Sequence, residues 1–352
     1  MDVHQLRMLV TENPVFRSYM FYTAILTLKM MFMSLLTIRQ RVMHNSFVSE
    51  EDAMYLKGMV SRTNEHVERV RRGHRNDMEN IYLFFVIGFA YTWTDPSPFF
   101  ANLLFFIFTV SRLIHTCVYT VVIMPQPIRG RAWLVGFLVT GYMAIRTLLH
   151  FFGIWCFIYI ARKPRKDVRN DKYTFIPALV KKCGESVLCK MVNTTSSAGP
   201  PDSVLTLNNP AFGVYLISAC LLVLKMMGMS LLTIYNRFKY KAFICPEDAK
   251  WLQGQVVSND TVERVRRAHQ NDLENIPIFL AAAFAYLWTQ PPAWLAWVLY
   301  LGFTILRALH TIVYTLIVLP QPTRALLWVA GYLLTGYMAV HAALHVFIYL
   351  IM

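Results

Sequence analysis

The chain has 352 residues, of which 56% are hydrophobic and 15% charged, and its formal net charge is +14 at pH 7. The hydrophobic residues are gathered in blocks longer than a soluble core helix needs, which excludes an ordinary water-soluble domain. Much of the basic charge lies in loops between these blocks, as in the cytosolic loops of membrane proteins, so the net charge does not indicate nucleic-acid binding.

Eight hydrophobic blocks predict transmembrane helices, because one bilayer crossing takes about 20 apolar residues. In chain order they cover residues 15–38, 81–94, 99–123, 132–160, 211–234, 276–289, 293–319 and 325–352. The second block of each set of four reaches the required length only if its polar N-terminal turns are included. The sequence therefore predicts an all-α membrane protein with eight spans.

The two halves of the chain are repeats of each other. LKMMFMSLLTI at 28–38 corresponds to LKMMGMSLLTI at 224–234, at an offset of 196 residues. VERVRRGHRNDMENI at 67–81 and VERVRRAHQNDLENI at 262–276 are identical at 12 of 15 positions, at an offset of 195. Such repetition predicts one four-helix transmembrane bundle used twice in tandem.

The predicted domains are a first repeat at 1–161, a flexible basic linker at 162–207 and a second repeat at 208–352. The linker is rich in charged and small polar residues, which is typical of flexible segments. Met191 stands where an independent second protein could start, so two neighbouring genes joined into one remain an alternative to a true fusion.

The loop charges predict the orientation of the spans. Loop 39–75 carries eight Lys or Arg and the turn 125–131 carries two, whereas the loop TDPSP carries none. Basic loops favour the cytosol, and an even number of spans per repeat makes the two repeats parallel. The linker does not fit this orientation. Counting spans places residues 162–205 in the lumen, yet they carry nine Lys or Arg, which favour the cytosol.

Polar side chains recur at helical spacing near the membrane mouth of the second block and inside the third. One face holds Arg72, Asn76 and Glu79, with Arg75 beside them, and the other holds Arg112, His115 and Tyr119. Ionisable groups at this depth are costly, and they normally face a bundle interior or a watery cavity. Their clustering near one membrane surface disfavours a channel or transporter path.

These faces allow two interpretations. The simpler one is an ion pair between Arg112 and Glu79 that only holds two helices together. Basic groups, however, outnumber the acids here: Arg72, Arg75, Arg112 and Arg129 stand against Glu79, with Asp77 offset from the Arg72 face. An excess of guanidinium groups favours a pocket for a ligand with carboxylates, while the lone Glu would bind an ammonium group.

The patterns ERVRRxHxNDxEN, RxxHTxxY and PQPxR resemble those of the MAPEG family, the membrane-associated proteins of eicosanoid and glutathione metabolism. The resemblance covers residues 14–150 and 210–350. It implies a membrane-bound glutathione transferase that conjugates glutathione to apolar electrophiles and reduces lipid hydroperoxides. Two other activities in this family are alternatives: a prostaglandin E synthase-type isomerase, and a non-catalytic lipid-binding scaffold like the five-lipoxygenase-activating protein.

The resemblance also implies the residues of two glutathione sites. In the first repeat they are Lys29, Arg41, Arg72, His74, Arg75, Asn76, Glu79, Arg112, His115 and Tyr119. In the second they are Lys225, Arg237, Arg267, His269, Asn271, Glu274, Arg307, His310 and Tyr314. Arg129 and Arg324, the arginines of PQPxR, match the catalytic position, where a fixed cation favours the thiolate of glutathione.

Two departures from the family pattern bear on activity. Gln270 stands in the second repeat where Arg75 stands in the first, so one cation is missing there. Gly130 and Ala325 follow the catalytic arginines, where the isomerase has a serine, which favours the transferase. Retention of both arginines beside a full glutathione set favours an enzyme over a scaffold.

The family forms homotrimers with glutathione between neighbouring subunits, so the resemblance implies a trimer-like assembly of repeats. Two repeats do not complete a threefold ring, and the sequence does not decide how the third position is filled. The expected location is the endoplasmic reticulum membrane, with the mitochondrial outer membrane as an alternative and the glutathione sites facing the cytosol. The expected partners are membrane lipid and apolar substrates, and neither a metal nor nucleic acid is expected.

Overall fold

The computed structural model describes residues 13–47, 50–61, 64–124, 126–162, 204–207, 209–319 and 322–351. Most of the predicted linker therefore lies outside the described residues. The first repeat contains α2 (Pro14–Met43), β1 (Ser46–Phe47), α3 (Glu50–Tyr55), β2 (Met59–Val60), α4 (Glu65–Thr92), α5 (Pro98–Thr116), the π-helical turn η1 (Cys117–Val121) and α6 (Gln126–Arg162). The second contains α8 (Pro210–Tyr240), β3 (Ala242–Phe243), α9 (Pro246–Trp251), β4 (Gln255–Val256), α10 (Asp260–Leu287), α11 (Ala293–Thr311), the π-helical turn η2 (Ile312–Leu316) and α12 (Thr323–Ile351).

The first two long helices of each repeat begin where the sequence supplies an asparagine cap. The Asn13 side chain accepts a hydrogen bond from the backbone N–H of Val15 at 2.9 Å, directly before a proline in the first helical turn. Asn209 does the same for α8, and Asn64 and Asn259 cap α4 and α10. Such caps satisfy backbone donors that a helix start leaves unpaired, so helix starts repeat with the sequence.

The prediction of an all-α membrane protein is confirmed, and the described residues form eight long helices in two sets of four. Six of them are long and apolar enough to cross a membrane. The other two are α4 and α10, whose N-terminal halves carry the charged repeat motif. Eight crossings therefore remain a prediction, since the crossing of α4 and α10 depends on how much charged helix enters the bilayer.

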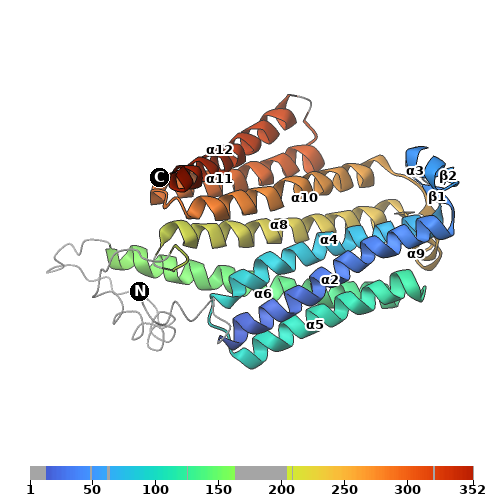
Figure 1. Ribbon diagram of the computed structural model, residues 1–352, viewed down its shortest axis with the longest axis horizontal. Helices are drawn as coiled ribbons and strands as arrows, with labels where there is room; N and C mark the ends of the chain where they lie inside the picture. Colours follow the sequence, from blue (N-terminus) through green and yellow to red (C-terminus); the bar gives the residue numbers. More distant parts are fainter. Residues whose placement is uncertain are drawn as a thin grey trace.

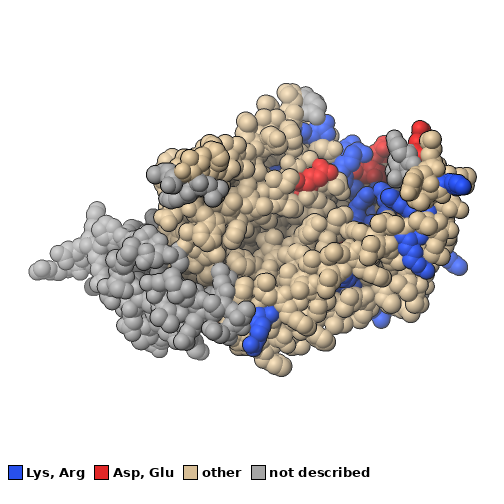
Figure 2. All heavy atoms as spheres, in the orientation of Figure 1, with Lys and Arg blue, Asp and Glu red and all other residues tan. Residues whose placement is uncertain are grey.

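The repeats lie parallel, as the even number of helices predicted (Figure 1). Helices α2 and α8 run in the same direction, and α3 and α9 lie at the same end of the molecule. In each repeat the two short strands pair in parallel, β1 with β2 and β3 with β4. Most of the Lys, Arg, Asp and Glu visible in Figure 2 gather at this end, while the middle of the molecule is almost free of visible charge. The end of the molecule that holds the short strands is thus charged, whereas the middle, where the helices would cross a membrane, shows little charge.

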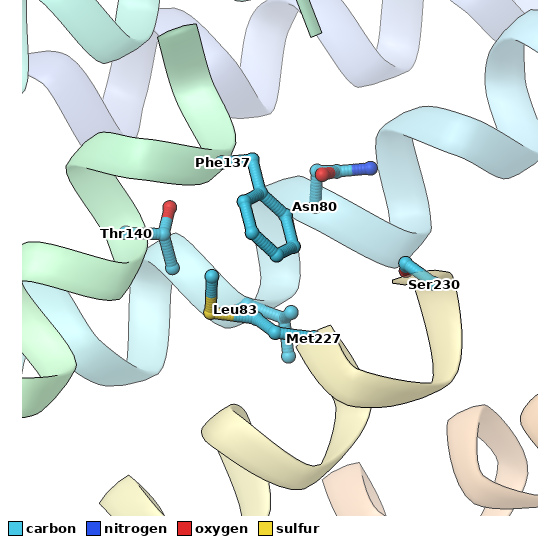
Figure 3. Close-up of a pocket in the computed structure, with 6 residues that line it drawn as sticks. All are labelled: Asn80, Leu83, Phe137, Thr140, Met227 and Ser230. Carbon is cyan, nitrogen blue, oxygen red and sulfur yellow. The ribbon is translucent and has the colours of Figure 1, made fainter. Parts of the chain in front are cut away.

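The second repeat packs against the first mainly through α8, which lies on α4 and α6. Near the middle of this contact is a narrow gap with no room for a water molecule (Figure 3). Its lining is Asn80, Leu83, Phe137, Thr140, Met227 and Ser230. The gap is therefore a packing feature of the interface and not a ligand site.

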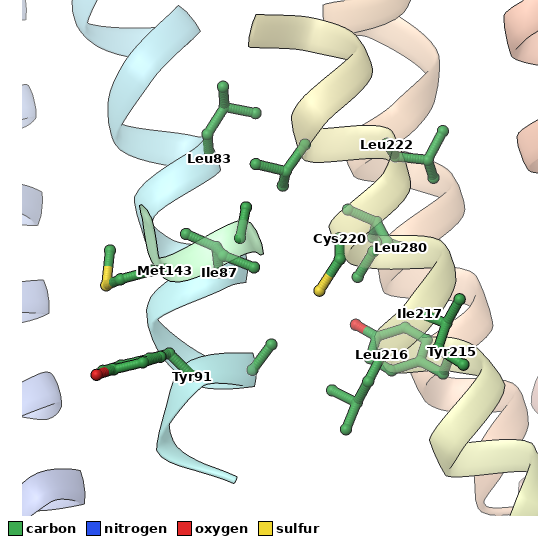
Figure 4. Close-up of a cluster of buried hydrophobic side chains, with 14 of the residues drawn as sticks. Leu83, Ile87, Tyr91, Met143, Tyr215, Leu216, Ile217, Cys220, Leu222 and Leu280 are labelled. Atoms are coloured by element: carbon green, nitrogen blue, oxygen red, sulfur yellow. The ribbon is translucent and has the colours of Figure 1, made fainter. Parts of the chain in front are cut away.

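One hydrophobic cluster runs through both repeats (Figure 4). Leu83 and Ile87 of α4 face Cys220 of α8 across the contact, with Met143 of α6 beside them. All four side chains are buried. Burial of apolar surface contributes about 25 cal/mol per Å², although in a membrane lipid competes for the same surface and close packing matters more. Within the chain, the two bundles form one packed body.

Close packing at this contact gives a stability prediction for Gly141. A Cβ atom placed there would lie 3.1 Å from Met227 Cε, so Gly141→Leu should overpack the contact and destabilise the chain by about 1–3 kcal/mol. Gly228→Leu is the matched control, because no described atom lies within 4 Å of a Cβ there. Thermal denaturation in detergent measures the difference, and equal stability of the two variants would contradict close packing at Gly141.

Candidate functional site

A buried carboxylate, Asp77, organises the polar groups at membrane depth in the first repeat. Its Oδ1 accepts a hydrogen bond from Arg112 Nη2 at 2.7 Å, and its other oxygen pairs with Lys29. Arg112 Nη2 also donates to Asn76 Oδ1 at 2.8 Å. The interpretation that Arg112 pairs with Glu79 is wrong, because Asp77 and Glu79, two residues apart, lie on different sides of α4.

The second repeat builds the same network around Asp272. Arg307 donates to Asp272 Oδ1 from Nη2 at 2.5 Å and from Nε at 3.2 Å, and Lys225 pairs with the other oxygen. Arg307 also donates to Asn271 Oδ1 at 2.8 Å. Four cations predicted to contact a ligand therefore already have a carboxylate partner: Lys29, Arg112, Lys225 and Arg307.

The arginine that the sequence predicts to be catalytic lies, in each repeat, over a tyrosine on the π-helical turn. In the first repeat the guanidinium carbon of Arg129 is 5.0 Å from the ring centre of Tyr119, and His115 stacks on the same ring at 5.6 Å. In the second repeat Arg324 lies 4.9 Å from the ring centre of Tyr314. Single π-helical turns are frequent at functional sites, and here the turn carries the tyrosine that the arginine covers.

Side chains of the second repeat reach into the first site. Tyr119 Oη lies 3.3 Å from Cys245 Sγ, just before α9, and Arg129 forms a buried ion pair with Asp248 of α9. This arrangement closes the first site with a segment of the second repeat, so the first site belongs to both repeats.

A second ion pair at the same end joins α4 to α9. Arg69 Nη2 lies 2.7 Å from Glu247 Oε1. Burial raises the pKa of Glu247, but hydrogen bonds from Arg69 and from its own backbone N–H outweigh burial and hold the pKa below its usual value. The carboxylate is thus charged at neutral pH, and the pair weakens only as the pH falls through this lowered pKa.

Glu79 faces the second repeat. It acts electrostatically on Arg237 of α8 and His269 of α10. On the same helix as Glu79, Arg72 has two buried guanidinium nitrogens, Nε and Nη2, without a hydrogen-bond partner among the described residues. The first site therefore combines a carboxylate with guanidinium donors that are available to a ligand.

The second site lines a cavity of about 380 Å³. Six of its lining residues were predicted from the sequence, and they are Arg267, Asn271, Glu274, His310, Tyr314 and Arg324. Gln270, Ala325 and Trp328 complete the lining. Gln270 occupies the position of Arg75 and donates to Glu274 Oε1 at 3.2 Å. Arg324 makes no ion pair with any described residue, in contrast to the buried Arg129.

The structure therefore divides the predicted residues into two layers. Lys29, Asn76 and Arg112, with their counterparts, belong to the buried carboxylate networks, and His115 Nδ1 lies 3.4 Å from Arg112 Nη2. His74, Arg75 and Arg41 lie outside these networks and are half-buried.

The residues that sequence reasoning missed are the acids and the thiol that complete these layers. The motif has an acid after its asparagine in both copies, Asp77 after Asn76 and Asp272 after Asn271, so its repetition was a signal that the acid matters. Asp248 lies in the repeated Glu-Asp-Ala segment, but no sequence pattern says that it contacts the other repeat.

The MAPEG family model matches the chain twice, at residues 19–149 and 215–344. The chain is 43% identical over 142 residues to microsomal glutathione S-transferase 1 of Mus musculus, covering 39% of this chain and 91% of that protein. It is 40% identical over 144 residues to the Homo sapiens protein of the same name, covering 40% and 92%. Prostaglandin E synthase of Homo sapiens is 34% identical over 141 residues, with the same coverage of 40% and 92%. Each relative thus has the length of about one repeat. The two matches to the family model together span most of the chain, so the chain belongs to the MAPEG family as a tandem duplication.

Proposed function

We propose that the chain is a membrane-bound glutathione transferase, which joins glutathione to apolar electrophiles and uses glutathione to reduce lipid hydroperoxides. The observation that carries this proposal is the cavity of the second repeat, where Arg267, Glu274 and Arg324 line one space. Relatives named microsomal glutathione S-transferase 1, at about 40% identity, support it.

The charges of the cavity fit those of glutathione, which has two carboxylates, one ammonium group and one thiol. Arg267 and the Asn271 amide suit a carboxylate, and Glu274 suits the ammonium group. Arg324 then remains for the thiol, with its Nε buried and without a partner among the described residues. A cavity of about 380 Å³ lies within the range of small-molecule sites, about 300–1,000 Å³.

Arg324 and Arg129 would supply the chemical activation. A free thiol has a pKa of about 8.5, and a fixed guanidinium nearby favours the thiolate, which is the nucleophile. The thiolate sulfur forms a bond to the electrophilic carbon, and the leaving group departs with its bonding electron pair. With a hydroperoxide, two glutathione molecules are oxidised to the disulfide while the hydroperoxide is reduced to an alcohol and water.

The charged end of the molecule is where both sites lie, and basic loops favour the cytosol. We therefore place the sites at the cytosolic face of a membrane such as that of the endoplasmic reticulum, where soluble glutathione is accessible. Apolar substrates would enter from the bilayer.

The test is to add glutathione to the full chain in membranes and to follow the ultraviolet absorbance of the thiolate, together with conjugation of a chlorodinitrobenzene. S-methylglutathione serves as the control, because it binds but has no thiol to ionise. The proposal expects absorbance and conjugate from glutathione only. Binding of both compounds without thiolate or conjugate would instead identify a binding scaffold.

Glu274→Gln should weaken glutathione binding at the second site by about tenfold or more, since a charge-assisted hydrogen bond contributes about 1.5–3 kcal/mol. Titration with glutathione acylated at its amine checks the assignment, because that ligand has no ammonium group and should lose nothing on substitution. Glu263→Gln is the control, since Glu263 pairs with Arg266 on the helix surface. Equal losses for both ligands would show that Glu274 does not bind the ammonium group.

A further inference from the structure

The second repeat exposes lysines at the charged end of the molecule where the first repeat has uncharged residues. Lys239 and Lys241 stand at the end of α8, and Lys250 lies on α9. All three side chains are exposed. At the offset of 196 residues, their counterparts in the first repeat are Met43, Asn45 and Met54. The two repeats therefore present different surfaces here, although their folds correspond.

Neighbouring acids do not cancel the charge of these lysines. Residues 235–254 contain four Lys or Arg and two acids, whereas the corresponding residues 39–58 contain three of each. The two acids of the second segment, Glu247 and Asp248, form ion pairs with arginines of the first repeat. The three lysines form no ion pair with any residue in the described part of the chain. The exposed charge of this segment is thus positive.

Aromatic side chains accompany the lysines on the surface. Phe238, Tyr240 and Trp251 are 51%, 40% and 54% exposed. Lys239 Nζ lies 5.3 Å from the ring centre of Tyr240, a cation–π contact. Aromatic rings and lysines that alternate along one segment are typical of the boundary between membrane and water, where rings lie among the headgroups. The composition therefore favours a lipid surface over open solvent.

The length of α8 places its end at the depth of the lipid headgroups. The apolar block 211–234 is about 36 Å long at 1.5 Å per residue, against about 30 Å for the hydrocarbon core of a bilayer. Lys239 follows this block by about 8 Å, and the headgroup layer is about 5–8 Å thick on each side. The long stem of a lysine side chain lets its ammonium group reach the phosphates from there.

Lys250 and Trp251 belong to the same short loop as Lys241. Strand β3, which follows Lys241, pairs with β4, and the backbone N–H of Gln255 donates to the Lys241 carbonyl oxygen at 2.9 Å. The six-residue helix α9 lies between these strands, and Lys250 and Trp251 are exposed at its C-terminal end. Because the loop closes on itself, its charges and rings act together.

We propose that this lysine–aromatic surface binds the headgroups of anionic phospholipids in the leaflet next to the charged end. It consists of Phe238, Lys239, Tyr240, Lys241, Lys250 and Trp251. The ammonium groups donate to headgroup phosphate and carboxylate oxygens, while the rings lie among the glycerol groups. The first repeat has no such surface, so anionic lipid is held on one side of the molecule. The proposal rests on exposure and charge and not on the proposed activity.

The first experiment titrates the full chain, in an uncharged detergent, with short-chain phosphatidylserine and with short-chain phosphatidylcholine. A ligand of the folded state raises the unfolding temperature, which circular dichroism measures. Phosphatidylserine should raise it more than phosphatidylcholine does, and salt should reduce the difference. Equal rises from the two lipids would overturn the proposal. So would an equal rise from glycerophosphoserine, which has the headgroup without acyl chains and would indicate a site for a soluble anion.

An exchange between repeats tests the location of the site. Lys239→Met, Lys241→Asn and Lys250→Met together install the residues of the first repeat, and the affinity for phosphatidylserine should fall by about tenfold or more. Asparagine suits the position of Lys241, because Lys241 and Asn45 both have a left-handed backbone, with φ of 49° and 48°. Unchanged affinity in this variant would contradict the assignment.

The reverse exchange is the matched control. Arg39→Tyr, Lys57→Gln and Arg131→Leu together remove three exposed positive charges and install the residues of the second repeat. This variant has the same net charge as the lysine variant and should keep the preference for phosphatidylserine. An equal loss in both variants would show that the overall charge of the chain attracts the lipid, and not this surface.

Discussion

Replacing Arg129 and Arg324 together with alanine should remove the thiolate signal of bound glutathione. Each arginine lies over its tyrosine on the π-helical turn, and each is the cation we assign to the thiol of its site. Loss of the cation should return the thiol pKa towards about 8.5 and lower the thiolate population at each site by about tenfold or more at pH 6.5 to 7. Each single substitution should remove the contribution of one site.

A pH series and a control variant test whether the arginines act through the pKa of the thiol. In the double variant the thiolate should reappear as the pH is raised through about 8.5, provided that glutathione is still bound. Arg131→Ala removes an exposed arginine two residues beyond Arg129 and should leave the signal unchanged. An unchanged signal in the double variant at neutral pH would mean that another group stabilises the thiolate.

Asp77→Ala should destabilise the protein by about 3–5 kcal/mol, which is the usual result of leaving buried charges without their partner. Asp77 is the shared acid of Lys29 and Arg112, and all three side chains are buried. Asp272→Ala should have a similar effect in the second repeat, where the acid holds Lys225 and Arg307. Thermal or denaturant unfolding in detergent, followed by circular dichroism, measures the loss.

A variant that removes the whole network distinguishes stability from chemistry. Lys29→Met, Asp77→Leu and Arg112→Met together replace the ions by apolar groups of similar length, so most of the lost stability should return. Glu68→Ala is the control, because Glu68 pairs with Arg71 on a more exposed face of α4 and should change stability by less than about 1 kcal/mol. If Asp77→Ala is as stable as this control, the buried network contributes little.

The sequence predicted what depends on local pattern. Hydrophobic block length located the long helices, and the internal repeat made both bundles alike and parallel. Six of the residues lining the second cavity were also predicted, through the resemblance to the MAPEG motifs, and helical spacing accounts only for those that share one face of a helix.

What the sequence did not predict depends on contacts between elements distant in the chain. Asp77 and Glu79 are two residues apart, and only helix packing decides which of them meets Arg112. Asp248 and Cys245 are separated from Arg129 and Tyr119 by more than a hundred residues. All but Cys245 are repeated in the other half of the chain. Repetition of the sequence therefore predicted the fold twice, but not the asymmetric contact between the two copies.

Closure of the first site by β3–α9 makes it insensitive to dilution. Both halves belong to one polypeptide, so their encounter is intramolecular and is governed by an effective concentration fixed by the chain, not by the amount of protein in the membrane. A site formed between separate single-repeat proteins would instead assemble according to their surface density. The duplication thus guarantees one closed site per molecule even where the protein is scarce.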